Sequence, residues 1–436
     1  LYALLALLAV LNLPAGDFST YHDYEKMTAA LRDLAAEYPE FVRLHEIGRS
    51  HDGKVLWVLE IAEPSGRPVS ERPGLLIAAN FEGSQIFGSE LALFIADYLV
   101  SSYSSDEEVK RVLDNHVIYI LPRANPDGAE KLFTAIKSGE RTNNRPFDND
   151  NDGRIDEDGF EDLNGDGVIS VMRVKDPKGG YMIHPDNPQL LKKADPAKGE
   201  SGVYQVYWEG IDNDGDGFYN EDPPGGVDIN RNFQHQYPYY QVDAGPYMVS
   251  EPETRAVLDF VLAHKNIAQI LTFGESDNLV NPPDSRGELK AKAVIEMFQY
   301  ADRSIEEARK VGIYEVEPPP SRFRFFMMGE SSDASSSRPR RPPREPEIRV
   351  NTADIPYFKK VSDKYRELTG ISSCPAVRIP AGAFFEYGYY QYGVPSFSTP
   401  GWGIAGEMKI DDSKREKAAE GEAQAQRAQR RPPSPK

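Results

Sequence analysis

Two short, continuously apolar segments constrain most strongly what this chain can fold into. Residues 74–80 read GLLIAAN and residues 117–122 read VIYILP. An uninterrupted apolar run of this length is typical of a strand that is covered on both faces, as in a parallel sheet between helices. These segments predict buried strands inside a layered fold.

The sequence around these strands alternates between helical and extended patterns. Apolar residues at helical spacing predict helices over residues 24–38, 88–99 and 254–264, and further strands are expected at residues 55–61 and 267–273. We therefore expect an α/β fold with a central, mixed, mostly parallel sheet sandwiched by helices. In such folds, functional sites lie at the carboxyl ends of the strands.

Composition excludes several classes of protein. The chain has 436 residues, of which 39% are hydrophobic, so it is globular and can bury a sizeable core. Its 50 basic and 69 acidic residues give a net charge of −19, which argues against binding to nucleic acid. Cys374 is the only cysteine, so neither an intrachain disulfide nor a zinc site made of thiolates is possible.

The chain divides into a leader, one large domain and a tail. Residues 1–16 are apolar and end in small residues, which predicts the remnant of a signal peptide and a secreted or periplasmic protein; a buried N-terminal helix is the alternative. Residues 17–404 form the domain, with no membrane span expected in the mature chain. Residues 318–349 are rich in Pro, Ser and Arg and predict a mobile loop, and residues 405–436 predict a disordered tail.

An acidic insertion at residues 146–224 carries three loops of calcium-binding type. Alternate oxygen-bearing side chains around a turn with glycine can surround a hard cation. The alternative is a set of solvated turns, and none of the loops has the glutamate at the twelfth position that a full EF-hand uses. We expect a structural role for calcium here. The candidate ligands are Asp148, Asp150, Asp152, Asp156, Asp158, Asp162, Asn164, Asp166, Asp212, Asp214, Asp216 and Asn220.

Four further motifs occur in a fixed order along the chain. They are GRSHDGK at residues 48–54, NPDG at residues 125–128, GVDINRNF at residues 226–233 and SEPE at residues 250–253. In sequence and order they closely resemble the zinc carboxypeptidase family, the carboxypeptidase A and B type of metallopeptidase. The resemblance extends from about Tyr21 to Trp402 and implies a sheet of about eight strands with the active site at its carboxyl-end edge.

The resemblance also implies a set of substrate-binding residues. Asn230 and Arg231 match the pair that binds the free α-carboxylate of a peptide, and a guanidinium suits that group because it donates two parallel hydrogen bonds. Tyr390 matches the tyrosine that closes over the substrate. Either Arg141 or Arg145 matches the arginine that polarises the scissile carbonyl. Internal ion pairs, such as one between Arg231 and Asp228, are the alternative reading of these arginines.

The positions that hold zinc in the family are substituted in this sequence. The family needs two histidines and one glutamate, with a fourth position open for water. Glu82 stands in place of the first histidine, Gln85 in place of the glutamate and Gly274 in place of the second histidine. The position of the general-base glutamate is taken by Gly401 or Pro400. We therefore predict that ordinary zinc carboxypeptidase chemistry is absent.

Three functions remain open at this point. The first is a non-catalytic relative, a pseudoenzyme, that binds peptide or protein C-termini in the old pocket. The second is an active metallocarboxypeptidase with a non-standard metal site, in which Glu82, Gln85 and Glu275 offer oxygen donors that suit calcium, magnesium or manganese better than zinc. The third is a secreted scaffold that is stabilised by calcium and has no ligand in the pocket.

Overall fold

The computed structural model describes residues 18–137, 139–148, 153–156, 158–213, 215, 217, 219–220, 225–289, 349–374 and 381–405. The predicted signal segment lies outside these residues. So do all but the last residue of the predicted mobile loop and all but the first residue of the predicted tail. Four of the predicted calcium ligands also lie outside them, namely Asp150, Asp152, Asp214 and Asp216.

The main sheet is mixed and mostly parallel. Its strand order is β1-β2-β4-β3-β9-β11, so the described residues supply six strands of the eight or so expected. β3 runs parallel to β4 and β9, and β11 runs parallel to β9, whereas β2 is antiparallel to both β1 and β4. The bounds are β1 Val42–Arg49, β2 Val55–Ile61, β3 Gly74–Ala79, β4 Val117–Leu121, β9 Ile267–Phe273 and β11 Ser396–Thr399.

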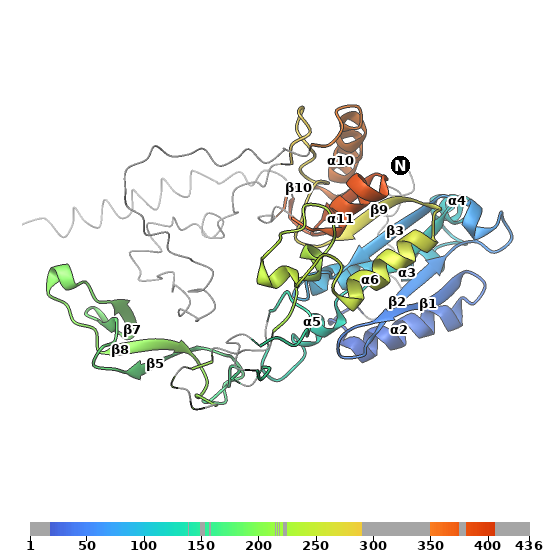
Figure 1. The fold of residues 1–436 in the computed structure, drawn as a ribbon. Helices are drawn as coiled ribbons and strands as arrows, with labels where there is room; N and C mark the ends of the chain where they lie inside the picture. The colour runs from blue at the N-terminus through green and yellow to red at the C-terminus, as the bar shows by residue number, and fades with distance from the viewer. Residues whose placement is uncertain are drawn as a thin grey trace, which may run out of the picture.

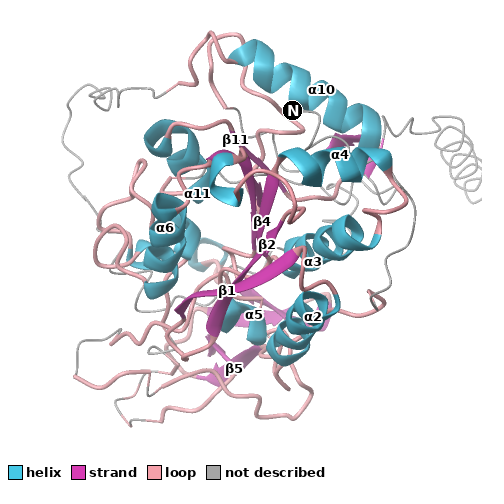
Figure 2. Ribbon diagram, turned by 90° about the vertical axis from the view of Figure 1, so that its right-hand side faces the viewer, coloured by secondary structure: helices cyan, strands magenta, loops and turns pink. Residues whose placement is uncertain are grey.

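Helices cover both faces of this sheet, which confirms the predicted α/β class (Figure 2). α2, α3, α4 and α10 pack on one face, and α6 and α11 pack on the other, each face having its own apolar cluster. The bounds are α2 Tyr24–Glu37, α3 Ile86–Ser101, α4 Glu107–Asn115, α6 Pro252–Ala263, α10 Ile355–Thr369 and α11 Phe384–Tyr387. The short helices are α5 Pro126–Glu130, η1 Val69–Glu71, η2 Pro196–Lys198, η3 Ile229–Arg231, η4 Val242–Ala244 and η5 Gly388–Tyr392.

Local sequence explains where the predicted elements begin and end. All six residues of β3 are buried, as its continuous apolar sequence predicts. The side chain of Asp23 caps α2 by accepting a hydrogen bond from the backbone N–H of Lys26, and Asp106 caps α4 in the same way. α6 starts at Pro252, whose fixed φ and missing N–H suit the first turn of a helix.

The acidic insertion contains a sheet of its own. This antiparallel sheet has the strand order β5-β8-β6-β7 and extends to one side of the main body (Figure 1). Its strands are β5 Val171–Lys175, β6 Tyr181–His184, β7 Asn187–Lys193 and β8 Tyr204–Trp208. A small third sheet pairs β10 Ile371–Ser373 with β12 Ile404–Ala405.

Within the described residues, no helix is long and apolar enough to cross a membrane. The feature that matters for function is the edge of the main sheet where β3 and β9 end side by side, since Ala79 pairs with Phe273 there. The substituted residues Glu82 and Gly274 follow directly after these two strand ends. The fold therefore brings together two of the positions that the sequence singles out.

Candidate functional site

Glu82 lies in the place where the two strands end, and its carboxylate is almost fully enclosed. The residue is 2% exposed. Its Oε1 accepts a hydrogen bond of 2.7 Å from Nδ2 of Asn230, and its Oε2 has no hydrogen-bond partner. The loop that carries it is held by Asn80, whose side-chain amide donates to the carbonyls of Glu82 and Gly83.

Gly274 provides the space that the Glu82 carboxylate fills. A Cβ atom at position 274 would stand 2.7 Å from Oε2 of Glu82, which is closer than real Cβ contacts come. A larger side chain at this position, including a histidine, would force the carboxylate to move. The two substitutions therefore fit each other sterically, although they are 192 residues apart (274 − 82).

Arg141 joins the remaining acidic groups of the site. Its Nε donates to Oδ2 of Asp228 over 3.2 Å, and its Nη1 forms an ion pair with Glu275. Nη2 of Arg141 is buried and has no hydrogen-bond partner. Gln85 lies in the same cluster, because its Nε2 donates to the other oxygen of Glu275 over 3.2 Å.

The electrostatics of this cluster favour a proton on Glu82. Burial raises the pKa of Glu82 to about 7, and repulsion from Asp228 and Glu275 acts in the same direction. The hydrogen bond from Asn230 and the charge of Arg141 oppose this rise only in part. Near neutral pH, Glu82 therefore exchanges between its neutral and ionised forms.

Asn230 and Arg231 lie at the surface end of this cluster, on η3. The side chain of Asp228 caps η3 by accepting from the backbone N–H of Asn230. Asn230 is occupied on both sides of its amide, because Oδ1 accepts from the backbone N–H of Phe384 over 3.0 Å while Nδ2 donates to Glu82. Arg231 forms an ion pair of 3.1 Å with Asp243.

The structure separates the other predicted substrate-binding residues. Arg145 lies outside the Glu82 cluster, because its Nη1 pairs with Glu251 at 2.9 Å. Tyr390 stacks on His235 with ring centroids 4.1 Å apart. Burial raises its pKa. Of the two arginines considered for the carbonyl-polarising role, only Arg141 lies with the substituted positions.

Gly401 cannot be exchanged for a glutamate without local rearrangement. Its φ of +76° lies in the left-handed region that favours glycine. A Cβ atom here would stand 2.7 Å from Cδ2 of Leu91 and 3.3 Å from Cδ1 of Phe273. The atoms nearest to such a Cβ belong to the apolar side chains of Leu91, Phe273 and Phe87.

The residues at the family's zinc positions do not fit zinc. Neither imidazole nor thiolate is present among Glu82, Gln85 and Gly274, and zinc in such sites prefers nitrogen and sulfur donors. Within the described residues, no three acidic or histidine side chains of this cluster place their ligand atoms within 4.8 Å of one another. The alternative of an oxygen-donor site that includes the amide of Gln85 stays a prediction.

A second titratable cluster, which the sequence analysis did not connect, contains His51, Glu251 and Glu253. Nε2 of His51 is 2.9 Å from Oε2 of Glu251, and both carboxylates accept hydrogen bonds from Nδ2 of Asn143. Burial raises the pKa of Glu253 to about 7. Although burial acts the other way on Glu251, hydrogen bonds from His51 and Asn143 lower its pKa to about 2.

These three side chains could in principle hold a metal ion, since their ligand atoms lie within 4.8 Å of one another. The surrounding groups make this unfavourable. Arg145 already neutralises Glu251, and the amide of Asn143 cannot turn its oxygen to a cation because that oxygen accepts from the backbone N–H groups of Val227 and Arg145. The arrangement is a hydrogen-bond network that links the GRSHDGK and SEPE motifs, in which Oε1 of Glu253 is buried and has no hydrogen-bond partner.

In the acidic insertion, the described loop side chains bind their own backbone. Asp162 accepts from the N–H groups of Gly165, Asp166 and Gly167, and Asn164 accepts from that of Asp166. Asp148 accepts from the N–H group of Gly153, Asp166 from that of Val168, and Asp212 from those of Gly215 and Gly217. Asp156 and Asp158 instead accept from distant backbone N–H groups, Asp156 from Gly225 and Asp158 from Asn213 and Asn220. The side-chain amide of Asn220 donates to the carbonyl of Trp208.

The fold and the motif positions define the class of this protein, and comparison with known families agrees. The family model described as zinc carboxypeptidase matches residues 27–311, which is well over half of the chain. The chain therefore belongs to the zinc carboxypeptidase family.

Particular relatives are similar over limited stretches. Carboxypeptidase M of Mus musculus is 39% identical over 112 residues, covering 26% of this chain and 25% of that protein. Carboxypeptidase D of Homo sapiens is 32% identical over 152 residues, covering 32% of this chain and 11% of that protein. The matched region thus spans a quarter or less of the length of these two relatives.

Solved structures with similar folds include a crystal structure of thrombin activatable fibrinolysis inhibitor. It has a TM-score of 0.39 at 16% identity and covers 71% of this chain and 64% of that one. The carboxypeptidase A of Helicoverpa armigera also has a TM-score of 0.39, at 18% identity, and covers 81% of this chain and 73% of that one.

Proposed function

We propose that this chain is a non-catalytic member of the zinc carboxypeptidase family that binds the C-terminal carboxylates of peptides without cleaving them. The observation that carries this proposal is the mutual fit of Glu82 and Gly274, because the carboxylate held by Asn230 would occupy the space expected for the zinc ion. The chemical groups that ionise a metal-bound water and move its proton are missing at the same time.

Carboxylate binding is supported by the arginines that remain at this edge of the sheet. The side chain of Arg141 is 32% exposed and that of Arg231 is 20% exposed, so a ligand can reach both. Asp243, at 44% exposure, occupies Arg231 in the absence of a ligand and would be replaced by the peptide carboxylate. Asn230 is less suited to this role than the sequence predicted, because Glu82 and Phe384 occupy its amide.

The test is calorimetric titration with a set of short peptides, each made once with a free C-terminus and once as the amide. Binding should require the free carboxylate. Arg231→Gln and Arg141→Gln should each weaken binding about tenfold, the effect of losing a charge-assisted hydrogen bond. Arg111→Gln is the matched control, because Arg111 forms an exposed ion pair with Glu108 on α4.

The alternatives from the sequence give different results in the same experiment. Release of the C-terminal residue would indicate an active carboxypeptidase with a non-standard metal site. Equal heats for the acid and the amide peptides, or no heat for either, would favour a scaffold without a ligand. Asp243→Asn should strengthen binding, since it removes the group that competes for Arg231.

Two further parts of the proposal concern cofactor and location. Structural calcium in the insertion is supported by the spacing of the acidic loops, and secretion or export to the periplasm is supported by the apolar leader at residues 1–16. Zinc, the cofactor of the family, has no role in this proposal.

A further inference from the structure

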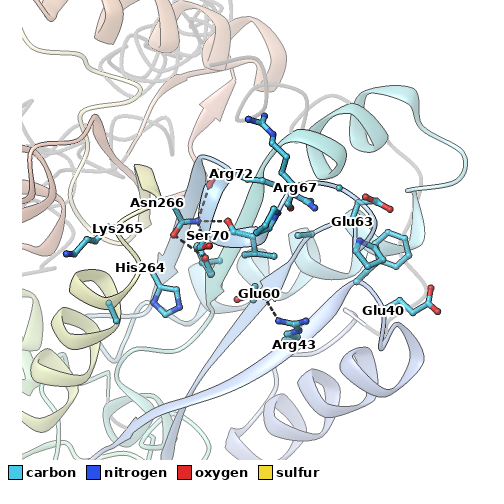
Figure 3. Close-up of a pocket in the computed structure, with 18 residues that line it drawn as sticks. Glu40, Arg43, Glu60, Glu63, Arg67, Ser70, Arg72, His264, Lys265 and Asn266 are labelled. Atoms are coloured by element: carbon cyan, nitrogen blue, oxygen red, sulfur yellow. Dashed lines mark hydrogen bonds and ion pairs between the residues drawn. The ribbon is translucent and has the colours of Figure 1, made fainter.

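A pocket with a volume of about 740 Å³ lies at the opposite end of the parallel strands from the Glu82 cluster. β3 and β9 begin there, since Gly74 pairs with Ile267 at their first residues. The loop between β2 and β3 forms one wall, and the end of α6 with the following residues 264–266 forms another (Figure 3). Its volume is in the range of pockets that hold small molecules.

The charges that line this pocket are unbalanced, although the chain as a whole has a net charge of −19. Arg67, Arg72 and Lys265 line it, and none of them forms an ion pair with a described residue. Arg43 also lines the pocket, so its walls carry four Arg or Lys side chains against three acidic ones. Glu60 lies 3.7 Å from Arg43 and 3.3 Å from His45, and Oε1 of Glu63 accepts two hydrogen bonds from Ser65.

Arg72 is the most unusual of these cations, because it is only 2% exposed. Its Nε donates to the carbonyl of Arg67 over 2.6 Å, and its Nη1 donates to the carbonyl of Leu113 over 3.3 Å. Carbonyl groups satisfy the donors but do not neutralise the charge. Oε2 of Glu63 lies near Nη2 of Arg72, because the two atoms are 3.4 Å and 2.6 Å from the place that a Cβ of Gly66 would take, but they form no ion pair. Asp114 feels this charge, yet its carboxylate is bound by Tyr103 and Lys110 and is not within ion-pair distance of Arg72. Buried guanidinium groups are seldom left without an anion.

The pocket also offers apolar surface beside these charges. Phe41, Pro64, Pro68, Val69 and Tyr119 contribute to its walls. An anionic ligand with a small carbon body would use both kinds of surface. A long polyanion is disfavoured, since the net negative charge of the chain repels it.

We propose that this pocket binds a small organic molecule that carries one phosphate or sulfate group, with the anionic group contacting Arg72 and Arg67. Figure 3 shows Arg67 and Arg72 on the same side of the pocket, whereas Lys265 points away from them. Lys265 therefore raises the local potential without direct contact. The site is independent of the Glu82 cluster and of the proposed binding of peptide C-termini.

The test is calorimetric titration of the full chain with phenyl phosphate, phenyl sulfate and inorganic phosphate at constant ionic strength. We expect saturable 1:1 binding of at least one phenyl ester and weaker binding of inorganic phosphate. Arg67→Gln should weaken binding about tenfold, and Lys265→Gln, which removes the same charge without the contact, about twofold. Arg72→Lys keeps the charge of a buried residue and should weaken binding by losing the planar donor geometry.

Several results would overturn this inference. They are the absence of saturable binding to either ester, equal affinity for phenyl phosphate and inorganic phosphate, and equal effects of Arg67→Gln and Lys265→Gln. Arg67 is exposed, so Arg67→Gln should fold normally even if Arg72→Lys does not. Binding of C-terminal peptides should be unchanged in Arg67→Gln, and this separates failure of the present inference from failure of the proposed function.

Discussion

Glu82 and Gly274 illustrate how one substitution in a binding site makes another necessary. The carboxylate of Glu82 is buried and needs both a donor and space, and it obtains the donor from Asn230 and the space from the missing side chain at position 274. A single return to histidine at either position would disturb this arrangement. If the metal site has been lost, as we propose, the loss involves both positions together.

This dependence can be measured with a double-mutant cycle. Gly274→Ala should lower the free energy of unfolding by about 1–2 kcal/mol, because its Cβ approaches Oε2 of Glu82. In the background of Glu82→Ala, the same change should cost little, since the clash has been removed. Urea unfolding of the four proteins gives the coupling energy. Equal costs in both backgrounds would mean that the two positions do not interact.

Contacts of this kind could not be predicted from the sequence. Glu82 and Asn230 are 148 residues apart, and nothing in the local pattern of either residue identifies its partner. The same holds for the cluster of His51 with Glu251, which are 200 residues apart. The positions that we interpret as substituted zinc ligands come from the register of the surrounding family motifs, and they stay a prediction.

At the scale of helices and strands, the elements with a clear apolar pattern were predicted closely. β2 and β9 have the bounds expected from the sequence, and α6 begins two residues earlier than expected because Pro252 can open a helix. β1 and the sheet of the insertion were not predicted. β1 is only partly buried along its length, and β5 alternates between exposed and half-buried residues, so neither forms a continuous apolar run.

The insertion provides the prediction that belongs to this scale. Calcium should raise the melting temperature by several degrees and slow proteolysis within residues 146–224, because a bound ion would offset the repulsion between neighbouring carboxylates. Magnesium at the same concentration serves as the ion control, and Asp162→Asn should reduce the calcium effect. No response to calcium, together with an unchanged response in Asp162→Asn, would show that these loops are ordinary solvated turns.

At the scale of the whole molecule, buried acids should make stability depend on pH. Burial raises the pKa of Glu82 and of Glu253 to about 7 and that of Glu386 to about 8, from an ordinary value of 4.5. The folded state therefore binds more protons than the unfolded state between these values. Stability should be highest near pH 5 and should fall as the pH rises to 8.

Denaturant unfolding between pH 5 and pH 8, at constant calcium concentration, measures this slope. Glu386→Gln should flatten the upper part of the curve, since a glutamine is neutral at every pH and Glu386 has the highest pKa of the three. Glu251 should not change the slope between pH 5 and pH 8, because its pKa is lowered from 4.5 to about 2. Its stabilising effect should be lost only as the pH falls below about 4.5. A stability that rises steadily from pH 5 to pH 8 would contradict the assignment of these buried protons.

The central claim is that this member of the zinc carboxypeptidase family has exchanged its metal site for a hydrogen-bonded carboxylate. It is tested most directly by the zinc content of the protein, determined by elemental mass spectrometry after purification without chelator and dialysis against trace zinc. We predict far less than one zinc ion per chain. One zinc ion per chain that is lost in Glu82→Ala would contradict the claim, because it would place the metal at the substituted site.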